Sequence, residues 1–402
     1  MTVPQETAQG ETELAAASSA HPLKVLHIIT GLQSGGAERI LLHLVSHLSK
    51  AQFSCEVVSL TTEGHLGRQI RAQGIPVRAL GFARGVPDLR LLPTLAAHIR
   101  RARPDLIQTW LHHADLAGGL AARLVRTAAP VVWSVHNAAI DPAKGKPQTA
   151  LLTRFNAHLA RFLCRKVVCV SEAVRAHCLY QGYAPDQLQV VVNGVDTDAF
   201  QPDPDARDSV RQELDLPPNT PLVGLMARFD PQKDHETFCR AAGLLRQTCP
   251  QAQFVLCGSG ITPNNAQLRD WLRVAGVGAS THLLGLRDDL PRLTAALDVA
   301  TCCSRYAESF ALVLAEAMAC GVPCVTTDMP GPVSVVGDLG YVVPIGDAAA
   351  LARAWQEMLT LTPAQFNHWG ERARARAVMH FSIPSMTAGY AALYRHLVGS
   401  KA

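Results

Sequence analysis

The sequence predicts an α/β protein of two doubly wound, Rossmann-like domains that face each other across a cleft. Its 402 residues exceed one ordinary hydrophobic core and suit two domains of roughly 150–200 residues each. Hydrophobic residues make up 48% of the chain and charged residues 17%, which is typical of a globular protein rather than a disordered one. Short apolar runs alternate with amphipathic helical patterns, which is the order of parallel β-α-β units.

The first half of the chain carries apolar runs that we expect to be buried parallel strands. Helical patterns fall between them. In residues 37–50, for example, the apolar side chains form one stripe at Ile40, Leu41, Leu44, Val45 and Leu48. The expected strands are residues 24–30, 53–60, 77–80, 105–110, 131–135, 166–170 and 189–193.

The same pattern restarts after a stretch rich in Asp, Pro and Gly at residues 193–205, which is typical of a linker. We therefore divide the chain into a first domain at 21–195, a linker at 196–206, a second domain at 207–380 and a final helical segment at 381–402. The strands expected in the second domain are residues 222–228, 253–258, 281–285, 298–303, 323–327 and 340–344.

The chain shows no sign of export or membrane insertion. Residues 1–20 lack Lys and Arg and lack a long apolar core, so they predict a disordered tail rather than a signal peptide. No apolar stretch reaches the roughly 18 residues of a membrane span. The 11 cysteines form no C-x-x-C pair, and most lie in apolar runs, which indicates buried thiols in a reducing compartment. We expect a cytoplasmic protein.

Charge is distributed unevenly along the chain. The net charge is +4, but residues 21–200 alone carry +9 and residues 201–402 carry −2. Basic residues cluster at 100–103 and again between 144 and 166. A basic first half favours an anionic partner there, such as the inner face of a membrane or a phosphate-bearing lipid. Ordinary solvated surface charge is the alternative. No basic-aromatic motif points to nucleic acid.

The loop after the first expected strand is rich in glycine. In GLQSGGAER, residues 31–39, Gly35 and Gly36 stand at the start of a helix, where free amides and the helix dipole favour an anion. The pattern is not G-x-G-x-x-G, and no acidic residue ends the second strand, so a dinucleotide site is not indicated. A plain glycine turn is the alternative.

Two cations follow the first strand of the second domain. Arg228 and Lys233 lie in MARFDPQKD, where a turn at Pro231 can bring them side by side. Arg offers a planar fork and Lys a compact charge, a pair suited to a diphosphate. Two ordinary surface cations are the alternative. Gly258 and Gly260 follow the next strand and suit the same kind of close approach.

Two carboxylates bracket the helical run ESFALVLAEAMACGVP. Glu308 and Glu316 are eight residues apart, which corresponds to roughly 12 Å along a helix. One could hold the hydroxyls of a hexose and the other those of a ribose. The amides of Ser309, Phe310, Ala311 and Leu312 would then lie between them, near a diphosphate. The alternative is a capping acid with a Glu at the rim.

Taken in order, these motifs resemble the family 4 (group 1) retaining glycosyltransferases. The resemblance rests on GGAE near the start, NGVD at the linker, R-x4-K, G-x-G and E-x7-E followed by AMACGVP, over roughly residues 24–395. It implies a GT-B fold, with acceptor binding in the first domain, nucleotide-sugar binding in the second and a C-terminal helix that crosses back to the first.

The resemblance also implies roles for individual residues. Arg228 and Lys233 would hold the diphosphate, Glu308 the donor sugar and Glu316 the ribose, while Gly35 and Gly36 would lie near the phosphate and the acceptor. His136, at a strand end in VVWSVHN, would face the reacting sugar. The chain departs from the family in two places: Ala311 stands where glycine is usual, and DMPGPVSVV lacks a Glu that often follows that strand.

The expected reaction is transfer of a hexose from a UDP- or GDP-sugar to a glycan or lipid-linked acceptor in cell-surface polysaccharide synthesis. Two D-x-D strings, at 196–198 and 203–205, resemble a metal-diphosphate motif but lie in the linker, and two cations already serve the diphosphate. We therefore expect no metal or other cofactor. The rival predictions are a GT-B-like nucleotide-sugar epimerase or hydrolase, and a binding protein without catalysis.

Overall fold

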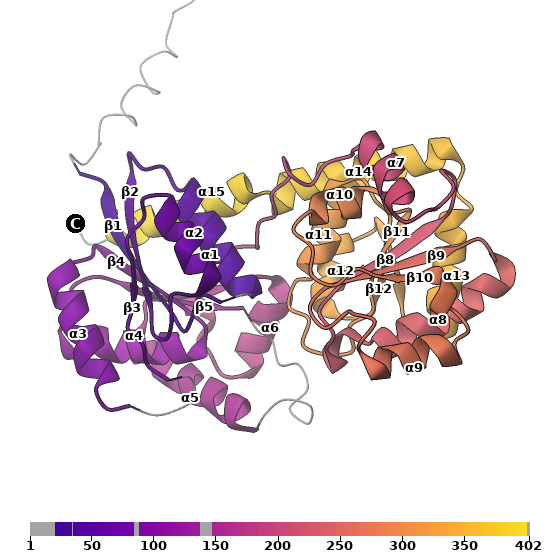
Figure 1. Ribbon diagram of the computed structural model, residues 1–402. Coiled ribbons are helices and arrows are strands. Elements are labelled where there is room, and N and C mark those ends of the chain that lie inside the picture. Colours follow the sequence, from indigo (N-terminus) through magenta and orange to yellow (C-terminus); the bar gives the residue numbers. More distant parts are fainter. Residues whose placement is uncertain (1–20, 34, 84–87, 137–146, 400–402) are drawn as a thin grey trace, which may run out of the picture.

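A computed structural model describes residues 21–33, 35–83, 88–136 and 147–399 of the chain. The expected tail at 1–20 and the basic residues Lys144 and Lys146 lie outside this part. The described chain forms two domains, each built on one parallel sheet (Figure 1).

The first sheet has the strand order β3-β2-β1-β4-β5-β6-β7, with every neighbouring pair parallel. All the strands expected in this half form. The strands are β1 (Leu23–Ile29), β2 (Phe53–Ser59), β3 (Val77–Ala79), β4 (Leu106–Trp110), β5 (Val131–Val135), β6 (Lys166–Cys169) and β7 (Leu188–Val190).

Helices cover both faces of this sheet, as its apolar strands require. In β1, Val25 and Ile29 join the core under α1 and the C-terminal helix, whereas Leu26 and Ile28 join the core under α3, α4 and α5. The helices are α1 (Gly36–His47), α2 (Gly64–Ala72), α3 (Leu91–Ala102), α4 (His112–Leu124), α5 (Pro147–Leu163) and α6 (Glu172–Tyr180), with a short turn η1 (Pro185–Gln187).

The second sheet repeats the plan with the order β10-β9-β8-β11-β12-β13, again all parallel. The six expected strands all form; five of them end one or two residues earlier than expected, and β12 ends where expected, at Thr327. They are β8 (Leu222–Met226), β9 (Gln253–Cys257), β10 (Thr281–Leu283), β11 (Val299–Cys302), β12 (Cys324–Thr327) and β13 (Gly340–Val343).

The helices of the second half divide between the two faces of its sheet. One core lies under α8, α9 and α13, and the other under α10, α11, α12 and α14. The helices are α7 (Pro204–Glu213), α8 (His235–Thr248), α9 (Ala266–Val274), α10 (Leu290–Ala295), α11 (Leu312–Ala319), α12 (Pro330–Val336), α13 (Ala348–Leu359), α14 (Pro363–Phe381) and α15 (Ile383–Gly399), with short turns η2 (Pro231–Lys233) and η3 (Gly278–Ser280).

The expected linker is partly helical. Helix α7 begins at Pro204, because Asp203 caps it by accepting a hydrogen bond from the Ala206 amide and proline suits the first helical position. Asp196 likewise accepts hydrogen bonds from the amides of Asp198 and Ala199. The first acid of each D-x-D string therefore stabilises the backbone around it.

The last helix, α15, lies against the first domain (Figure 1). Val195 pairs with Ser382 just before α15. The segment that leaves the first domain and the segment that returns to it therefore lie side by side. Tyr390 and Tyr394 of α15 are fully buried in the core beside β1 and α1. The C-terminal helix is thus part of the first domain's packing.

Within the described residues, no helix is both long and apolar enough to cross a bilayer. All 11 cysteines are free thiols, and most of them are buried.

Candidate functional site

The candidate site lies where the carboxyl ends of the two sheets meet. In doubly wound sheets, ligands bind beyond the carboxyl ends of the strands. Here the loop before α6 touches the loop before α11: the Ser171 hydroxyl donates to the Ser309 carbonyl at 2.7 Å. A Cβ placed on Gly36, at the start of α1, would lie 3.9 Å from the Leu312 side chain. The two sets of predicted site residues therefore face each other.

The centre of the second domain's share is an ion pair between Lys233 and Glu308. Lys233 Nζ donates to Glu308 Oε2, and the Ser304 hydroxyl donates to the same oxygen at 2.7 Å. The side chains of Lys233 and Glu308 are only 15% and 13% exposed. Burial lowers the pKa of Lys233, but the Glu308 carboxylate and the nearby Cys302 together outweigh burial, so this pKa lies above its ordinary value. Lys233 is therefore a fixed positive charge.

Local chain geometry holds Lys233 in place. Asp230 accepts a hydrogen bond from the Gln232 amide and starts the short turn η2, which ends at Lys233. Asp234 then adopts φ +50° and caps α8 by accepting from the Thr237 amide. The turn predicted at Pro231 is thus a capped helical turn at the end of β8.

Arg228 is the more open of the two predicted cations. Its guanidinium donates to Asp230 Oδ2 and to Gln232 Oε1, each at 3.2 Å, and its side chain is 56% exposed. Its charge acts on Lys233, lowering that pKa slightly against the larger effect of Glu308. The two cations thus share one loop, Lys233 buried and Arg228 at the solvent edge.

Gly258 lets the loop after β9 pack against the loop that carries Arg228. A Cβ at Gly258 would lie 2.3 Å from the Ala227 carbonyl oxygen and 2.9 Å from the Arg228 nitrogen. Its φ of +150° is also unusual for a residue with a side chain. A Cβ at Gly260 would lie 3.0 Å from the Cβ of Phe229. The G-x-G motif therefore allows close backbone packing beside the two cations.

The segment between Glu308 and α11 is not helical. Helix α11 begins only at Leu312, so Glu308, Ser309 and Phe310 precede it, and a continuous helical rise does not describe the Glu308–Glu316 separation. Ala311 adopts the left-handed conformation, with φ +57° and ψ +69°. The sequence position where the family usually has glycine is one where the backbone favours glycine.

Replacing Ala311 with glycine is expected to leave the free energy of unfolding unchanged or to raise it by up to about 1 kcal/mol. A left-handed alanine costs about 1–2 kcal/mol, and the greater freedom of glycine in the unfolded chain offsets part of that relief. The matched change Ala317→Gly, in the buried middle of α11, is expected to cost about 1 kcal/mol or more. Chemical denaturation of both variants measures this. An equal fall in the free energy of unfolding of the two variants would contradict backbone strain at position 311.

Glu316 lies apart from the Lys233–Glu308 pair, at the contact between the domains. It is buried on α11 and its carboxylate is 3.9 Å from the guanidinium of Arg39, on α1 of the first domain. Burial raises the pKa of Glu316, and Arg39 offsets part of this rise. A cavity of about 150 Å³, bordered by His43, Asp196 and Leu312 among others, adjoins this contact. The contact between Glu316 and a ribose, which the sequence resemblance implies, remains a prediction.

His136 lies on the first domain's side, at the end of β5, inside an aromatic cluster. Its ring stacks on Trp110 at a centroid distance of 5.2 Å, and its Nε2 is 2.9 Å from the Ser134 hydroxyl. The same hydroxyl lies 3.5 Å from Tyr390 of α15. Burial, with a smaller effect from His112, lowers the pKa of His136 to about 3. The imidazole is therefore uncharged at physiological pH, and in this state it can form hydrogen bonds.

Changing His136 to glutamine is expected to make the protein less sensitive to acid. The ordinary pKa of 6.5 applies to the unfolded chain, and the folded value is about 3. Between these values only the unfolded chain binds the proton, so the free energy of unfolding falls as pH falls, by about 1.4 kcal/mol per pH unit for this group. Denaturation between about pH 4.5 and 6.5 should show a correspondingly shallower slope for His136→Gln. An unchanged slope would contradict the buried, neutral state, and His368→Gln, at an exposed position on α14, is the control.

Gly35 and Gly36 lie at the start of α1. Gly35 is extended, with φ −172°, and precedes the helix without a side-chain cap. A Cβ there would lie 2.2 Å from a Glu38 carboxylate oxygen. Glycine therefore makes room for the side chain of Glu38 at this helix end.

Three further residues belong to the site and were not predicted. Ser304 contacts Glu308, Arg39 contacts Glu316, and Ser171 bonds across the cleft to Ser309. Ser171 also caps α6 by accepting from the Val174 amide. Its position directly between an apolar strand and a helical pattern could have marked it; nothing in the local sequence marks the pairings of Ser304 and Arg39.

Two family models match the chain. Residues 34–199 match the model described as Glycosyltransferase Family 4, and residues 206–376 match the one described as Glycosyl transferases group 1. Together they span both domains described above.

Several characterised proteins are similar over most of their length. The UDP-Gal:alpha-D-GlcNAc-diphosphoundecaprenol alpha-1,3-galactosyltransferase of Escherichia coli is 24% identical over 388 residues, covering 94% of this chain and 98% of that protein. The D-inositol 3-phosphate glycosyltransferase of Mycobacterium tuberculosis is 29% identical over 393 residues, covering 91% and 80%.

Solved structures share the fold. The Anabaena protein HepE in complex with UDP and glucose has a TM-score of 0.80 at 24% identity, covering 92% of this chain and 99% of that one. A glycosyltransferase from Rickettsia africae has a TM-score of 0.81 at 20% identity, covering 94% and 99%. These likenesses confirm the predicted fold class of two facing Rossmann-like domains.

Proposed function

We propose a specific reaction for this chain, which belongs to the glycosyltransferases whose two halves are Glycosyltransferase Family 4 and Glycosyl transferases group 1. It is a glycosyltransferase of the GT-B type. The proposed reaction is transfer of a hexose, with retention of anomeric configuration, from a UDP- or GDP-sugar to a glycan or lipid-linked acceptor. The pathway we propose is synthesis of a cell-surface polysaccharide.

The observation that carries this proposal is the cation pair at the end of β8 with Glu308 beside it. Departure of a nucleoside diphosphate builds negative charge on the β-phosphate oxygen. Lys233 and Arg228 supply positive charge where a ligand would lie against the carboxyl edge of the sheet. Preorganised charges of this kind are usually the largest single contribution to catalysis. The pairing of Lys233 with Glu308 keeps the ammonium in one position before the donor arrives.

The names of relatives favour a UDP-sugar and a lipid-linked acceptor. The Escherichia coli relative is named for UDP-galactose and a diphosphoundecaprenol-linked sugar, and the Anabaena structure holds UDP and glucose. The Mycobacterium relative is named for an inositol phosphate, a soluble acceptor. We place UDP first among donors and a glycan carried on a lipid diphosphate first among acceptors.

We propose that attack occurs on the face from which the diphosphate leaves, without a protein nucleophile. A double-displacement scheme needs two carboxylates about 5 Å apart that flank the bond. Glu308 is held by Lys233 and Ser304, whereas Glu316 lies against Arg39 at the other end of the segment. In this scheme the acceptor hydroxyl forms the new glycosidic bond, the sugar–phosphate bond breaks, and the hydroxyl proton goes to the departing phosphate oxygen. Glu308 holds the sugar hydroxyls.

A donor panel tests the proposal. Purified full-length protein is mixed with UDP-, GDP- and ADP-hexoses, and binding is measured by calorimetry. Turnover is then measured with and without lipid-diphosphate glycan acceptors. We expect one nucleotide class to bind, and sugar to be transferred only when acceptor is present. Release of free sugar at the same rate without acceptor would indicate a hydrolase, and binding of no sugar nucleotide would overturn the proposal.

Chelation of divalent cations is expected to leave the transfer rate unchanged. Arg228 and Lys233 provide the positive charge that a metal would otherwise bring to the diphosphate. In the linker, Asp196 and Asp203 accept backbone hydrogen bonds. The measurement is initial rate after dialysis against EDTA. Loss of the rate, and its return on addition of Mg²⁺ or Mn²⁺, would replace this proposal with a metal-dependent one.

We further propose that the enzyme acts in the cytoplasm, at the inner face of a membrane. Eleven free thiols suit a reducing compartment. A lipid-linked acceptor would have to be met at a bilayer surface, and the net charge of +9 in residues 21–200 suits an anionic one.

A further inference from the structure

The outer face of α5 combines basic and aromatic side chains in an unusual way. Over residues 152–163, the part of the helix whose side chains the structure describes, the exposed positions recur at helical spacing and the positions between them are buried or half-buried. The exposed residues are Arg154, Phe155, His158, Arg161 and Phe162. Phe155 is 53% exposed and Phe162 70%. The sequence of α5 contains no acidic residue. A solvent-facing stripe normally mixes charges of both signs and leaves out large aromatic side chains.

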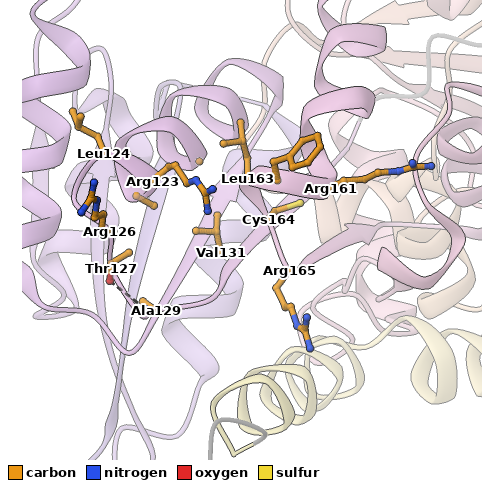
Figure 2. Close-up of a pocket in the computed structure, with 13 residues that line it drawn as sticks. Arg123, Leu124, Arg126, Thr127, Ala129, Val131, Arg161, Leu163, Cys164 and Arg165 are labelled. Carbon is orange, nitrogen blue, oxygen red and sulfur yellow. Dashed lines mark hydrogen bonds between the residues drawn. The ribbon is translucent and has the colours of Figure 1, made fainter.

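A basic pocket continues this face at the end of α5. The pocket has a volume of about 910 Å³ and lies between the C-terminal ends of α4 and α5. Figure 2 shows its four arginines, Arg123, Arg126, Arg161 and Arg165, on the two helix ends and the turns that follow. Leu124, at its rim, is 62% exposed.

These arginines are not explained by internal contacts. Arginine at a helix end often bonds the last carbonyls or pairs with a nearby acid. Across the residues that the structure describes, none of the four guanidinium groups has a carboxylate within ion-pair distance or a carbonyl within hydrogen-bond distance. Arg126 is also held with φ +52°, a conformation that side chains rarely adopt. Within the described parts of the chain, these charges therefore face solvent without a neutralising partner.

The pocket lies at the amino end of the first sheet, away from the candidate site. It borders the start of β5 at Val131 and the turn before β6 at Arg165. Helix α5, about 25 Å long from its 17 residues, runs antiparallel to the strands from the cleft end to this pocket. A flat surface laid along α5 would thus touch both the pocket and the cleft end of the first domain.

We propose that the exposed face of α5 and the arginine pocket at its end form a docking surface for an anionic phospholipid bilayer. The arginines bind lipid phosphates, and Phe155, Phe162 and Leu124 insert among the acyl chains near the headgroups. Interfacial helices combine basic side chains, which meet the headgroups, with aromatic side chains, which enter the boundary of the acyl chains. The proposal rests on the membrane part of the proposed function and gives it a location.

The test is binding of the full-length protein to vesicles, scored by sedimentation without any sugar donor. We expect binding to phosphatidylcholine vesicles that contain phosphatidylglycerol, weakening as salt is raised, and little binding to phosphatidylcholine alone. Since each basic residue at such a surface contributes about fivefold, R161Q/R165Q should bind roughly 25-fold more weakly. F155S/F162S should bind at least about tenfold more weakly.

The matched control is R240Q/R353Q, which removes the same charge from exposed positions on α8 and α13 of the second domain. It should bind vesicles like the wild type. Thermal unfolding and binding of the nucleotide that the donor panel identifies serve as checks that each variant is folded. Because vesicle binding needs no donor, a negative result here leaves the transfer reaction intact.

Three outcomes overturn the proposal: no binding to anionic vesicles, equal binding to neutral ones, or equal weakening by the control variant. A separate arm titrates inorganic pyrophosphate into the protein in the absence of lipid. Pyrophosphate binding that R161Q/R165Q abolishes, without vesicle binding, would assign the pocket to a soluble phosphate ligand instead. Sugar transfer to a soluble acceptor should be unchanged in R161Q/R165Q, since these arginines lie at the other end of the sheet.

Discussion

Lys233→Ala is expected to lower kcat for sugar transfer by roughly 10²–10³-fold, which is the usual cost of removing one preorganised group that stabilises a developing charge. Lys233 is buried beside Glu308, and its pKa is raised, so it is a permanent cation at the end of β8. If it acts on the departing diphosphate, it acts more strongly in the transition state than on the bound donor. The loss should then appear mainly in kcat, with a smaller change in KM.

The measurement is initial rate against donor concentration, with the nucleotide that the panel identifies. Arg228→Ala should also lower the transfer rate. Arg228→Lys should not keep the wild-type rate, because a lysine lacks the planar fork of arginine. Arg240→Ala, at an exposed position on α8, is the control for loss of a cation in the same domain. Transfer by Lys233→Ala at close to the wild-type rate would remove the diphosphate role.

Glu308→Gln is expected to lower the transfer rate by roughly 10²-fold, for two combined reasons. The carboxylate that we assign to the sugar hydroxyls becomes a weaker, neutral acceptor. Lys233 also loses the partner that holds it and that raises its pKa, so the lowering effects of burial and of Arg228 are then less strongly opposed. Glutamine keeps the shape of glutamate and can still accept the hydrogen bond from Ser304, so the fold should survive.

A double-mutant cycle separates the two reasons. If Lys233 and Glu308 act as one unit, Lys233→Ala combined with Glu308→Gln should be little worse than the more severe single variant. If each contacts the donor independently, the two losses should multiply. Glu371→Gln, at an exposed position on α14, is the control, and thermal unfolding of each variant checks that activity is lost without loss of structure. A rate for Glu308→Gln within a few fold of wild type would exclude a donor-sugar role for this carboxylate.

The Arg39–Glu316 contact shows why the second predicted carboxylate needs separate tests. Glu316 meets a cation from the other domain, at 3.9 Å. A ribose bound by Glu316 would compete with Arg39 for the same carboxylate. The predicted ribose contact and the domain contact are therefore coupled, and the structure adds a partner that the E-x7-E motif by itself does not contain.

Most of the fold could be predicted because its signals are local. Buried parallel strands are short apolar runs, such as 131–135 and 253–257, and the helices between them show periodic apolar stripes. The prediction was less accurate at element ends. Pro204, assigned to the linker, begins a helix, because the cap formed by Asp203 depends on a backbone angle as well as on residue type. The stretch after Glu308 is an irregular turn rather than the first turn of α11.

Local sequence patterns are enough to predict the two-domain parallel architecture, and the chain itself supplies the chemical types of the site residues and their order. Each of these depends on short stretches of sequence, because hydrophobic periodicity and turn residues act over a few positions. Which of these residues come into contact depends on how the folded chain packs. Lys233 finds Glu308 75 residues away because β8 and β11 are neighbours in the sheet. His136 is buried by Trp110 and lies in the cluster with Tyr390 because the last helix returns to the first domain. Such contacts depend on strand order and domain packing, which no local pattern specifies.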